Sequence, residues 1–163
     1  MAKTLLQFDP THFVPDASNP PGVDQVQDRV FLAYDDTTVE TARTKAIEWP
    51  QGYAAGALKA KLYYFMASAT SGLVDFEVSI EAVTDADPLV LDAADSFDTA
   101  NAAQATVPGT AGHLDMLDIT LGNIDSVAIG DMVRFKLERD ADDGTDDTAS
   151  GDARVIALII EEA

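Results

Sequence analysis

The chain has no cysteine among its 163 residues, and it has only 2 histidines and 1 tryptophan. Without cysteine, disulfides, thiol nucleophiles and cysteine-ligated zinc are excluded. Basic residues are also scarce, because 10 lysines and arginines stand against 29 acids and leave a formal net charge of −19. A surface this negative repels phosphate backbones and anionic lipids, so we expect neither a nucleic-acid nor a membrane partner.

Long apolar runs are missing as well. No stretch approaches the roughly 20 residues that span a bilayer, and the opening MAKTLLQFDPTHF lacks the apolar centre of a signal peptide. The hydrophobic content is nevertheless 47%, which is typical of a folded domain. We therefore expect one domain with room for a sizeable core, plus a short extension.

The charge is distributed unevenly along the chain. Residues 1–67 carry 8 acids and 6 bases, whereas residues 68–163 carry 21 acids and 4 bases. Two explanations stay open, namely a solvated exterior that keeps a crowded assembly soluble and adaptation to a saline medium. The weaker charge of the first part indicates that this part contacts a partner.

The first 28 residues contain four of the seven prolines, which fix φ and remove donors, so no helix is expected there. The segment also carries apolar side chains that a loose linker would not need: Leu5, Leu6, Phe8, Phe13 and Val14. They fit either an irregular strand on the chain's own domain or an arm that reaches a neighbouring subunit. We predict an extended N-terminal arm over residues 1–28, with these five side chains docking on a partner.

From Arg29 onward, apolar and polar residues alternate with the period of β-strands. Strands are expected at 29–34, 44–49, 58–66, 74–81, 104–107, 114–121, 132–139 and 154–161. On the strand at 74–81, the acids Asp75, Glu77 and Glu81 are expected to form a solvated face. The last strand is apolar on both faces, so it is either central in a sheet or covered by another subunit.

Residues 84–103 are poor in strand formers and predict either a short helix or a long surface crossover. Eight to ten strands with little helix and one long crossover predict an all-β fold. We expect an antiparallel β-sandwich or jelly roll over residues 29–163, preceded by the arm.

No motif for catalysis or metal binding is convincing. His12 and His113 lie in different contexts and no G-x-S-x-G occurs, so we predict no catalytic residues, no cofactor and no enzyme activity. The acidic loop at 140–147 departs from the EF-hand pattern, because its glycine falls at position 5 and position 12 is Gly151. We interpret this loop as a solvated hairpin tip, with an incidental calcium site as the alternative.

Five aromatic residues lie between positions 49 and 65: Trp49, Tyr53, Tyr63, Tyr64 and Phe65. They fit packing between the two sheets, or a platform on which a sugar ring stacks.

From Arg43 onward, the order of strand edges and turns is suggestive. The segments that carry it are IEWPQGY (47–53), GAL (56–58), YYFMASATSG (63–72), VDFEV (74–78), DSF (95–97), VAIGD (127–131), FKLERD (135–140) and GDA (151–153). In these segments the chain resembles small virion structural proteins of tailed phages with a jelly-roll-like domain.

The resemblance implies a non-enzymatic capsid decoration or cement protein on the outside of a phage head. It also implies a homotrimer whose partners are its own copies and the major capsid protein or other virion proteins. The alternative that we retain is a tail or fibre component that binds a host-surface glycan.

Overall fold

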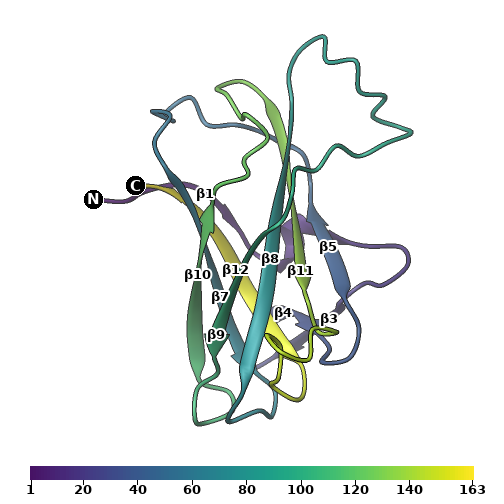
Figure 1. The fold of residues 1–163 in the computed structure, drawn as a ribbon, viewed down its shortest axis with the longest axis vertical. Coiled ribbons are helices and arrows are strands. Elements are labelled where there is room, and N and C mark those ends of the chain that lie inside the picture. The colour runs from purple at the N-terminus through teal and green to yellow at the C-terminus, as the bar shows by residue number, and fades with distance from the viewer.

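The computed structural model describes residues 1–163 and contains twelve β-strands and one short 3-10 helix, η1 (Pro10–His12). The strands form two antiparallel six-stranded sheets that pack face to face (Figure 1). Sheet A has the order β10 (Leu114–Leu121), β7 (Leu58–Met66), β12 (Ala153–Glu162), β4 (Arg29–Tyr34) and β3 (Gly22–Val26), with β1 (Lys3–Phe8) also paired to β12. Sheet B has the order β2 (Phe13–Pro15), β5 (Glu40–Thr44), β11 (Met132–Arg139), β8 (Leu73–Val83) and β9 (Asn101–Thr106), with β6 (Ile47–Glu48) also paired to β11. The predicted all-β sandwich is therefore confirmed, with more strands than the eight to ten expected.

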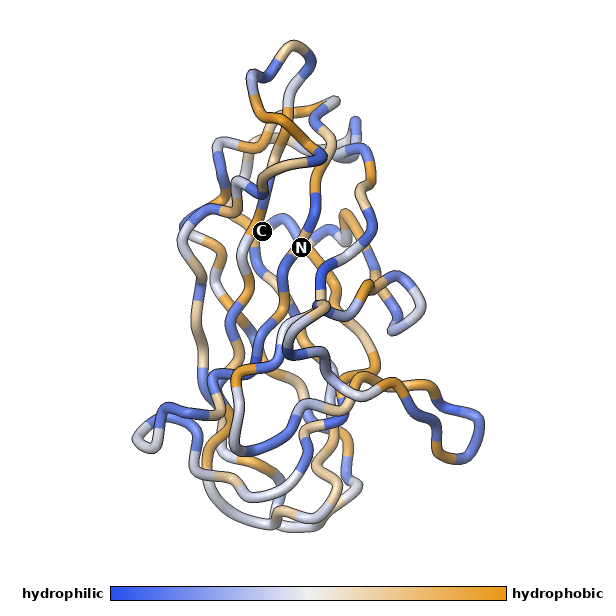
Figure 2. The backbone as a smooth tube through the Cα atoms, turned by 90° about the vertical axis from the view of Figure 1, so that its right-hand side faces the viewer, coloured by the Kyte–Doolittle hydropathy of each residue, from blue (hydrophilic) through white to orange (hydrophobic).

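Alternation of side chains decides which face each strand buries. In β7, every second residue from Leu58 to Met66 is buried between the sheets, and the residues between them are partly exposed on the outside. Figure 2 shows this alternation of hydrophobic and hydrophilic residues along the strands. The inward faces of both sheets join in one continuous core of 31 residues, so the chain folds as one unit.

The N-terminal segment is part of this sandwich and not an extended arm. β1 pairs with β12, β2 pairs with β5, and β3 pairs with β4. Leu6, Phe8 and Phe13 are buried in the common core, and Leu5 packs partly against it. The docking role predicted for Leu5, Leu6, Phe8 and Phe13 is wrong, because the chain's own sheets bury them wholly or in part, whereas for Val14 it stays a prediction. Only Val14 is free on the surface, with 52% of its area exposed.

The last strand, β12, lies centrally in sheet A. β7 pairs along one side of it, and β1 and β4 share the other side. This confirms the central placement, which was one of the two alternatives for a strand apolar on both faces. The pairing of β1 with β12 also brings the two chain ends side by side (Figure 1).

The connection between β8 and β9, which we call the β8–β9 loop, is long and rises beyond the ends of the sheets (Figure 1). It contains no helix, so the helix alternative for this region is wrong. The crossover alternative is wrong as well, because β8 and β9 pair with each other as antiparallel neighbours. The β8–β9 loop returns to sheet B where the Ser96 amide donates to the Glu81 carboxylate and the Asp98 amide donates to the Ile80 carbonyl. The chain has no helix with the length and apolar content needed to cross a membrane.

The solvated acidic face predicted for β8 is wrong for two of its three acids. Glu81 is buried where the β8–β9 loop folds over sheet B, and Asp75 is buried where the loop after β11 packs against β8. Glu77 lies between them and stays partly exposed. Segments distant in sequence therefore cover both ends of this face.

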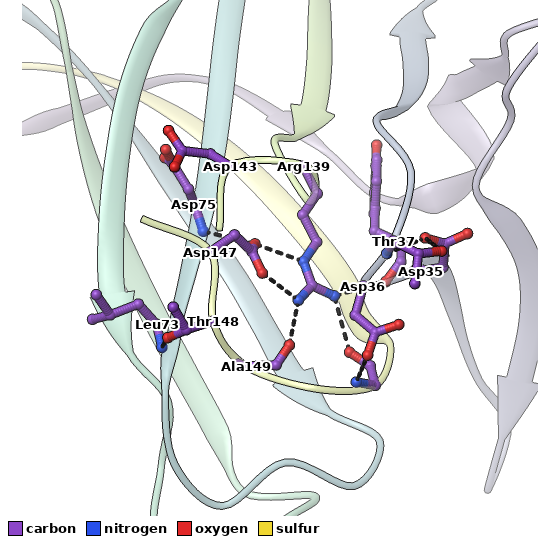
Figure 3. A network of polar contacts seen from close by, with 12 residues as sticks. Asp35, Asp36, Thr37, Leu73, Asp75, Arg139, Asp143, Asp147, Thr148 and Ala149 are labelled. Carbon is purple, nitrogen blue, oxygen red and sulfur yellow. Dashed lines mark hydrogen bonds and ion pairs between the residues drawn. The ribbon is translucent and has the colours of Figure 1, made fainter. Parts of the chain in front are cut away.

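The acidic loop at 140–147 is anchored and is not a free hairpin tip (Figure 3). Arg139 is fully buried and donates to both carboxylate oxygens of Asp147, at 2.8 and 2.7 Å. It also donates to the carbonyls of Tyr34, Ala149 and Gly151. The buried guanidinium thus ties the loop to the body of the sandwich.

Candidate binding site

A surface pocket of about 540 Å³ lies between the β8–β9 loop and sheet B and includes Glu81, Leu91, Met132 and Arg134 in its lining. Its main polar groups bind one another. The Nε of Arg134 donates to Glu81 at 2.6 Å, and the other Glu81 oxygen accepts the Ser96 amide at 2.8 Å. The hydrogen bond to Glu81 raises the pKa of Arg134, so the guanidinium stays charged. The ion pair of Arg134 with Glu81 holds the β8–β9 loop on the sheet, so these two side chains have a structural role.

A second pocket, of about 390 Å³, lies on the outer face of sheet A. We call it the arginine pocket, and its lining consists of Val26, Arg29, Phe65, Gly112, Leu114, Arg154 and Ile156. A third pocket, of about 320 Å³, shares Arg29 and Ile156 with it. We call this third pocket the adjoining pocket. The shared residues place the two pockets next to each other.

Strand register brings the arginine pocket together. Phe65 on β7 lies opposite Leu114 on β10 and opposite Arg154 on β12. The register of β12 shifts at Ile156, and such a bulge re-aims side chains locally. The pocket therefore depends on three strands whose residues lie far apart in sequence.

The tight β3–β4 hairpin supplies Val26 and Arg29 to the lining of the arginine pocket. Gln27 and Asp28 both have positive φ, of 48° and 62°, as a two-residue turn of the I′ type requires. The turn pairs Val26 with Arg29 at the tip of the β3–β4 hairpin. Arg29 is exposed there, and the one hydrogen bond that its side chain donates is a long one, 3.5 Å to the Gln27 carbonyl.

Arg154 is held by aromatic rings. Its guanidinium carbon lies 4.8 Å from the centre of the Phe31 ring and 5.7 Å from that of Phe65. The two rings meet edge to face at 5.7 Å. Phe31 lies outside the core cluster yet is only 2% exposed, so the guanidinium and Phe65 act as its cover. Such cation–π contacts fix the plane of the guanidinium.

The hydrogen-bonding capacity of Arg154 is not used within the chain. Its Nε is buried and has no partner. The arginines Arg43, Arg134 and Arg139 each form an ion pair with a carboxylate, whereas Arg29 and Arg154 form none. Two unpaired cations side by side are unexpected in a chain of net charge −19. The Nη groups of Arg154 also form no hydrogen bond within the chain, so they can donate to a ligand in the pocket.

The surroundings of the two arginines are apolar. In the pocket lining, Leu114 is 60% exposed and Val26 is 39% exposed. Exposed apolar side chains beside a few polar groups are typical of small-molecule sites.

Inter-sheet packing is confirmed for three of the five aromatic residues noted in the sequence, and the sugar platform stays a prediction. Trp49, Tyr53 and Tyr64 are buried in the core, as inter-sheet packing requires. Tyr63 and Phe65 lie on the outer face of sheet A, and Phe65 lines the arginine pocket. Sequence reasoning missed both arginines, although an arginine beside the apolar run of the last strand was a signal for a special role.

His12 has a structural role, and His113 is exposed just before β10. The Nδ1 of His12 accepts the Asp9 amide at 3.2 Å and completes the cap of η1. No group of three or more histidine and acidic side chains is placed to hold a metal ion. This finding includes the carboxylates of the loop at 140–147.

Comparisons with known proteins identify the fold alone. No protein-family model matches the chain, and no curated protein matches it in sequence. A CBM22-1 xylan-binding domain from Paenibacillus barcinonensis superposes with a TM-score of 0.52 at 11% identity, over 99% of this chain and 95% of that one. The C-terminal CBM6 of a marine laminarinase from Zobellia galactanivorans superposes with a TM-score of 0.50 at 12% identity, over 98% and 100%.

An exo-β-1,3-galactanase from Phanerochaete chrysosporium gives a TM-score of 0.54 at 10% identity, over 97% of this chain but only 29% of that enzyme. The chain thus corresponds to one part of the galactanase. The resemblance to phage virion proteins is not addressed by these structures and stays a prediction. What the similarities establish is that the chain has the jelly-roll β-sandwich fold of these carbohydrate-binding domains.

Proposed function

We propose that this protein is a non-catalytic carbohydrate-binding β-sandwich and that sugar binds in the arginine pocket. The observation that carries the proposal is Arg154, whose guanidinium lines the pocket, is stacked on two rings and forms no ion pair within the chain. A sugar ring has apolar C–H faces and polar edges. It can therefore lie against Phe65 and Leu114 while its oxygens accept hydrogen bonds from the arginine.

Binding without catalysis follows from the lining of the pocket. Hydrolysis of a glycosidic bond generally requires a pair of carboxylates placed on either side of it. No carboxylate and no histidine lines the arginine pocket. A sugar bound there meets donors and apolar surface, and no general acid or base.

This proposal takes up the glycan-binding alternative that the sequence left open. The similarity in fold to a xylan-binding domain and a CBM6 supports it, at identities that carry no ligand assignment. A place in a phage tail or fibre is compatible with such a role and stays a prediction.

A glycan array probed with the full chain tests the proposal. We expect binding to at least one class of glycan, and a loss of about tenfold or more in the double variant Arg29→Gln/Arg154→Lys. Lysine at position 154 keeps a charged chain over Phe31 but lacks the planar fork of donors, which limits the effect on folding. Circular dichroism and Tm would verify that the variant is folded.

The matched control is Lys59→Gln, which removes one positive charge from the same strand as Phe65 but outside the pocket. It should bind as the wild type does. Dissociation constants above about 1 mM for every glycan would refute the proposed function. Binding that the double variant leaves unchanged would refute the proposed site.

A further inference from the structure

We infer that the arginine pocket recognises the carboxylate of an acidic sugar, a uronic-acid residue flanked by a neutral sugar. This inference rests on the proposed function and specifies the class of ligand at the same site.

The first argument is the imbalance of donors and acceptors in the pocket. Its polar side chains are Arg29 and Arg154 alone, and each guanidinium carries five N–H donors and no acceptor. A hydroxyl of a neutral sugar both donates and accepts, so in this lining it would find no side-chain acceptor for its own proton. A carboxylate only accepts, and it therefore matches a lining that only donates.

The second argument is the pairing of the other arginines. Arg43, Arg134 and Arg139 bind Asp16, Glu81 and Asp147 respectively. The chain thus supplies a carboxylate to each arginine except the two in this pocket. Guanidinium and carboxylate are planar and form paired hydrogen bonds, which gives such contacts both strength and orientation.

The third argument is that Arg154 is already in place. Stacking on Phe31 and Phe65 fixes the guanidinium plane before a ligand arrives. A side chain that is ordered in advance loses little rotamer freedom on binding, which favours affinity. The Nη groups on this fixed plane form no hydrogen bond within the chain, so a carboxylate in the pocket can accept from them while the guanidinium keeps its position.

The adjoining pocket supplies what the arginine pocket lacks. Its lining includes the carboxylate of Asp9 and the hydroxyl of Thr11, both exposed, beside the shared Arg29 and Ile156. The Oδ1 of Asp9 accepts from Thr11, at 2.8 Å from its amide and 2.6 Å from its hydroxyl. The exposed carboxylate can also accept from a sugar hydroxyl. A neutral residue next to the uronic acid therefore fits there.

The net charge of the chain limits the form of the ligand. With a net charge of −19, the protein repels a polyanion, and salt at 0.1 M weakens this repulsion beyond about 10 Å. The two arginines attract only at contact distance. An isolated uronic residue among neutral sugars should therefore bind more tightly than a stretch of consecutive uronates.

Titration calorimetry with defined disaccharides at 0.15 M salt tests the inference. The probes are cellobiose and its counterpart with a terminal glucuronic acid, with galacturonic and mannuronic analogues, a methyl ester of the best binder, and a sulfated disaccharide. We expect at least one uronate to bind at least tenfold more tightly than the neutral parent, and the methyl ester to lose that advantage.

The same titrations with Arg29→Gln and with Arg154→Lys should reduce the preference for the acid severalfold, and Lys59→Gln should leave it unchanged. Equal affinity for acidic and neutral sugars, with loss in both arginine variants, would overturn the acid specificity and leave glycan binding intact. Binding to no sugar would overturn both proposals. Tighter binding of the sulfated sugar, or of an acidic peptide, than of every uronate would overturn the assignment to a sugar carboxylate.

Discussion

The ion pair between Arg139 and Asp147 should be among the most sensitive points of the fold. We consider the substitution Asp147→Asn, which keeps the shape of the side chain and removes its charge. In the wild type the guanidinium is completely buried and donates five hydrogen bonds between 2.7 and 3.2 Å (Figure 3). Two of the five go to the Asp147 carboxylate, which supplies the compensating charge.

The expected cost follows from this burial. Removing one member of a buried pair leaves an uncompensated charge in the interior, which costs about 3–5 kcal/mol. One Asp147 oxygen also accepts the Asp75 amide at 3.0 Å, so an asparagine NH₂ at either position faces a donor. A domain of this kind has a total stability of about 5–15 kcal/mol. The variant should therefore lose at least about a fifth of its stability.

Urea unfolding followed by circular dichroism measures the loss. With a slope of about 2 kcal/mol per molar urea, the midpoint should fall by about 1.5–2.5 M. The matched control is Asp118→Asn, because its ion pair with Lys59 is solvent-exposed and should contribute less than about 1 kcal/mol.

A second variant separates charge burial from packing. Replacing both partners, as Arg139→Met/Asp147→Leu, removes the charge pair together and should be less damaging than Asp147→Asn alone. If Asp147→Asn shifts the midpoint no more than the Asp118→Asn control, the guanidinium is not held in a dry interior and the reasoning fails.

Three further predictions concern the rest of the fold. Phe8→Ala should lower the free energy of unfolding in urea by about 3–5 kcal/mol, because Phe8 lies in the core and is not a docking residue. A loss near zero would support the N-terminal arm predicted from the sequence. Burial, then the nearby carboxylates of Glu77 and Asp140, raise the pKa of Asp75 to about 7. The folded state thus binds this proton more tightly than the unfolded state. The Tm of the wild type should therefore fall as the pH rises from 4 to 7, and the Tm of Asp75→Asn should fall less. An equal change of Tm with pH in the two proteins would contradict this. Gly72→Ala should lower Tm well below that of Gly109→Ala, because Gly72 has φ +98° and its added Cβ would lie 2.9 Å from the backbone at 148–149, whereas Gly109 has open space. Equal Tm values would show that the backbone there adapts.

Patterns local in sequence determined the fold class and several strands. The alternation at 58–66, 114–121 and 132–139 coincides with β7, β10 and β11, because side-chain direction in a strand depends only on the nearest neighbours. The same periodicity places Phe65 on an outer face. The apolar content of the first 28 residues likewise showed that they must be buried.

Only the tertiary structure decided what buries the apolar residues of the first 28 positions and where the binding site lies. Burial of Phe8 requires β1 to pair with β12 at the other end of the chain, and no local pattern distinguishes this from docking on a neighbour. The arginine pocket likewise needs the register of three strands, a bulge at Ile156 and the tip of the β3–β4 hairpin. Acids such as Asp75 and Glu81 are solvated or buried according to which distant segment covers them. Periodicity determines the direction of a side chain, whereas its neighbours depend on long-range pairing, which one strand's sequence does not encode.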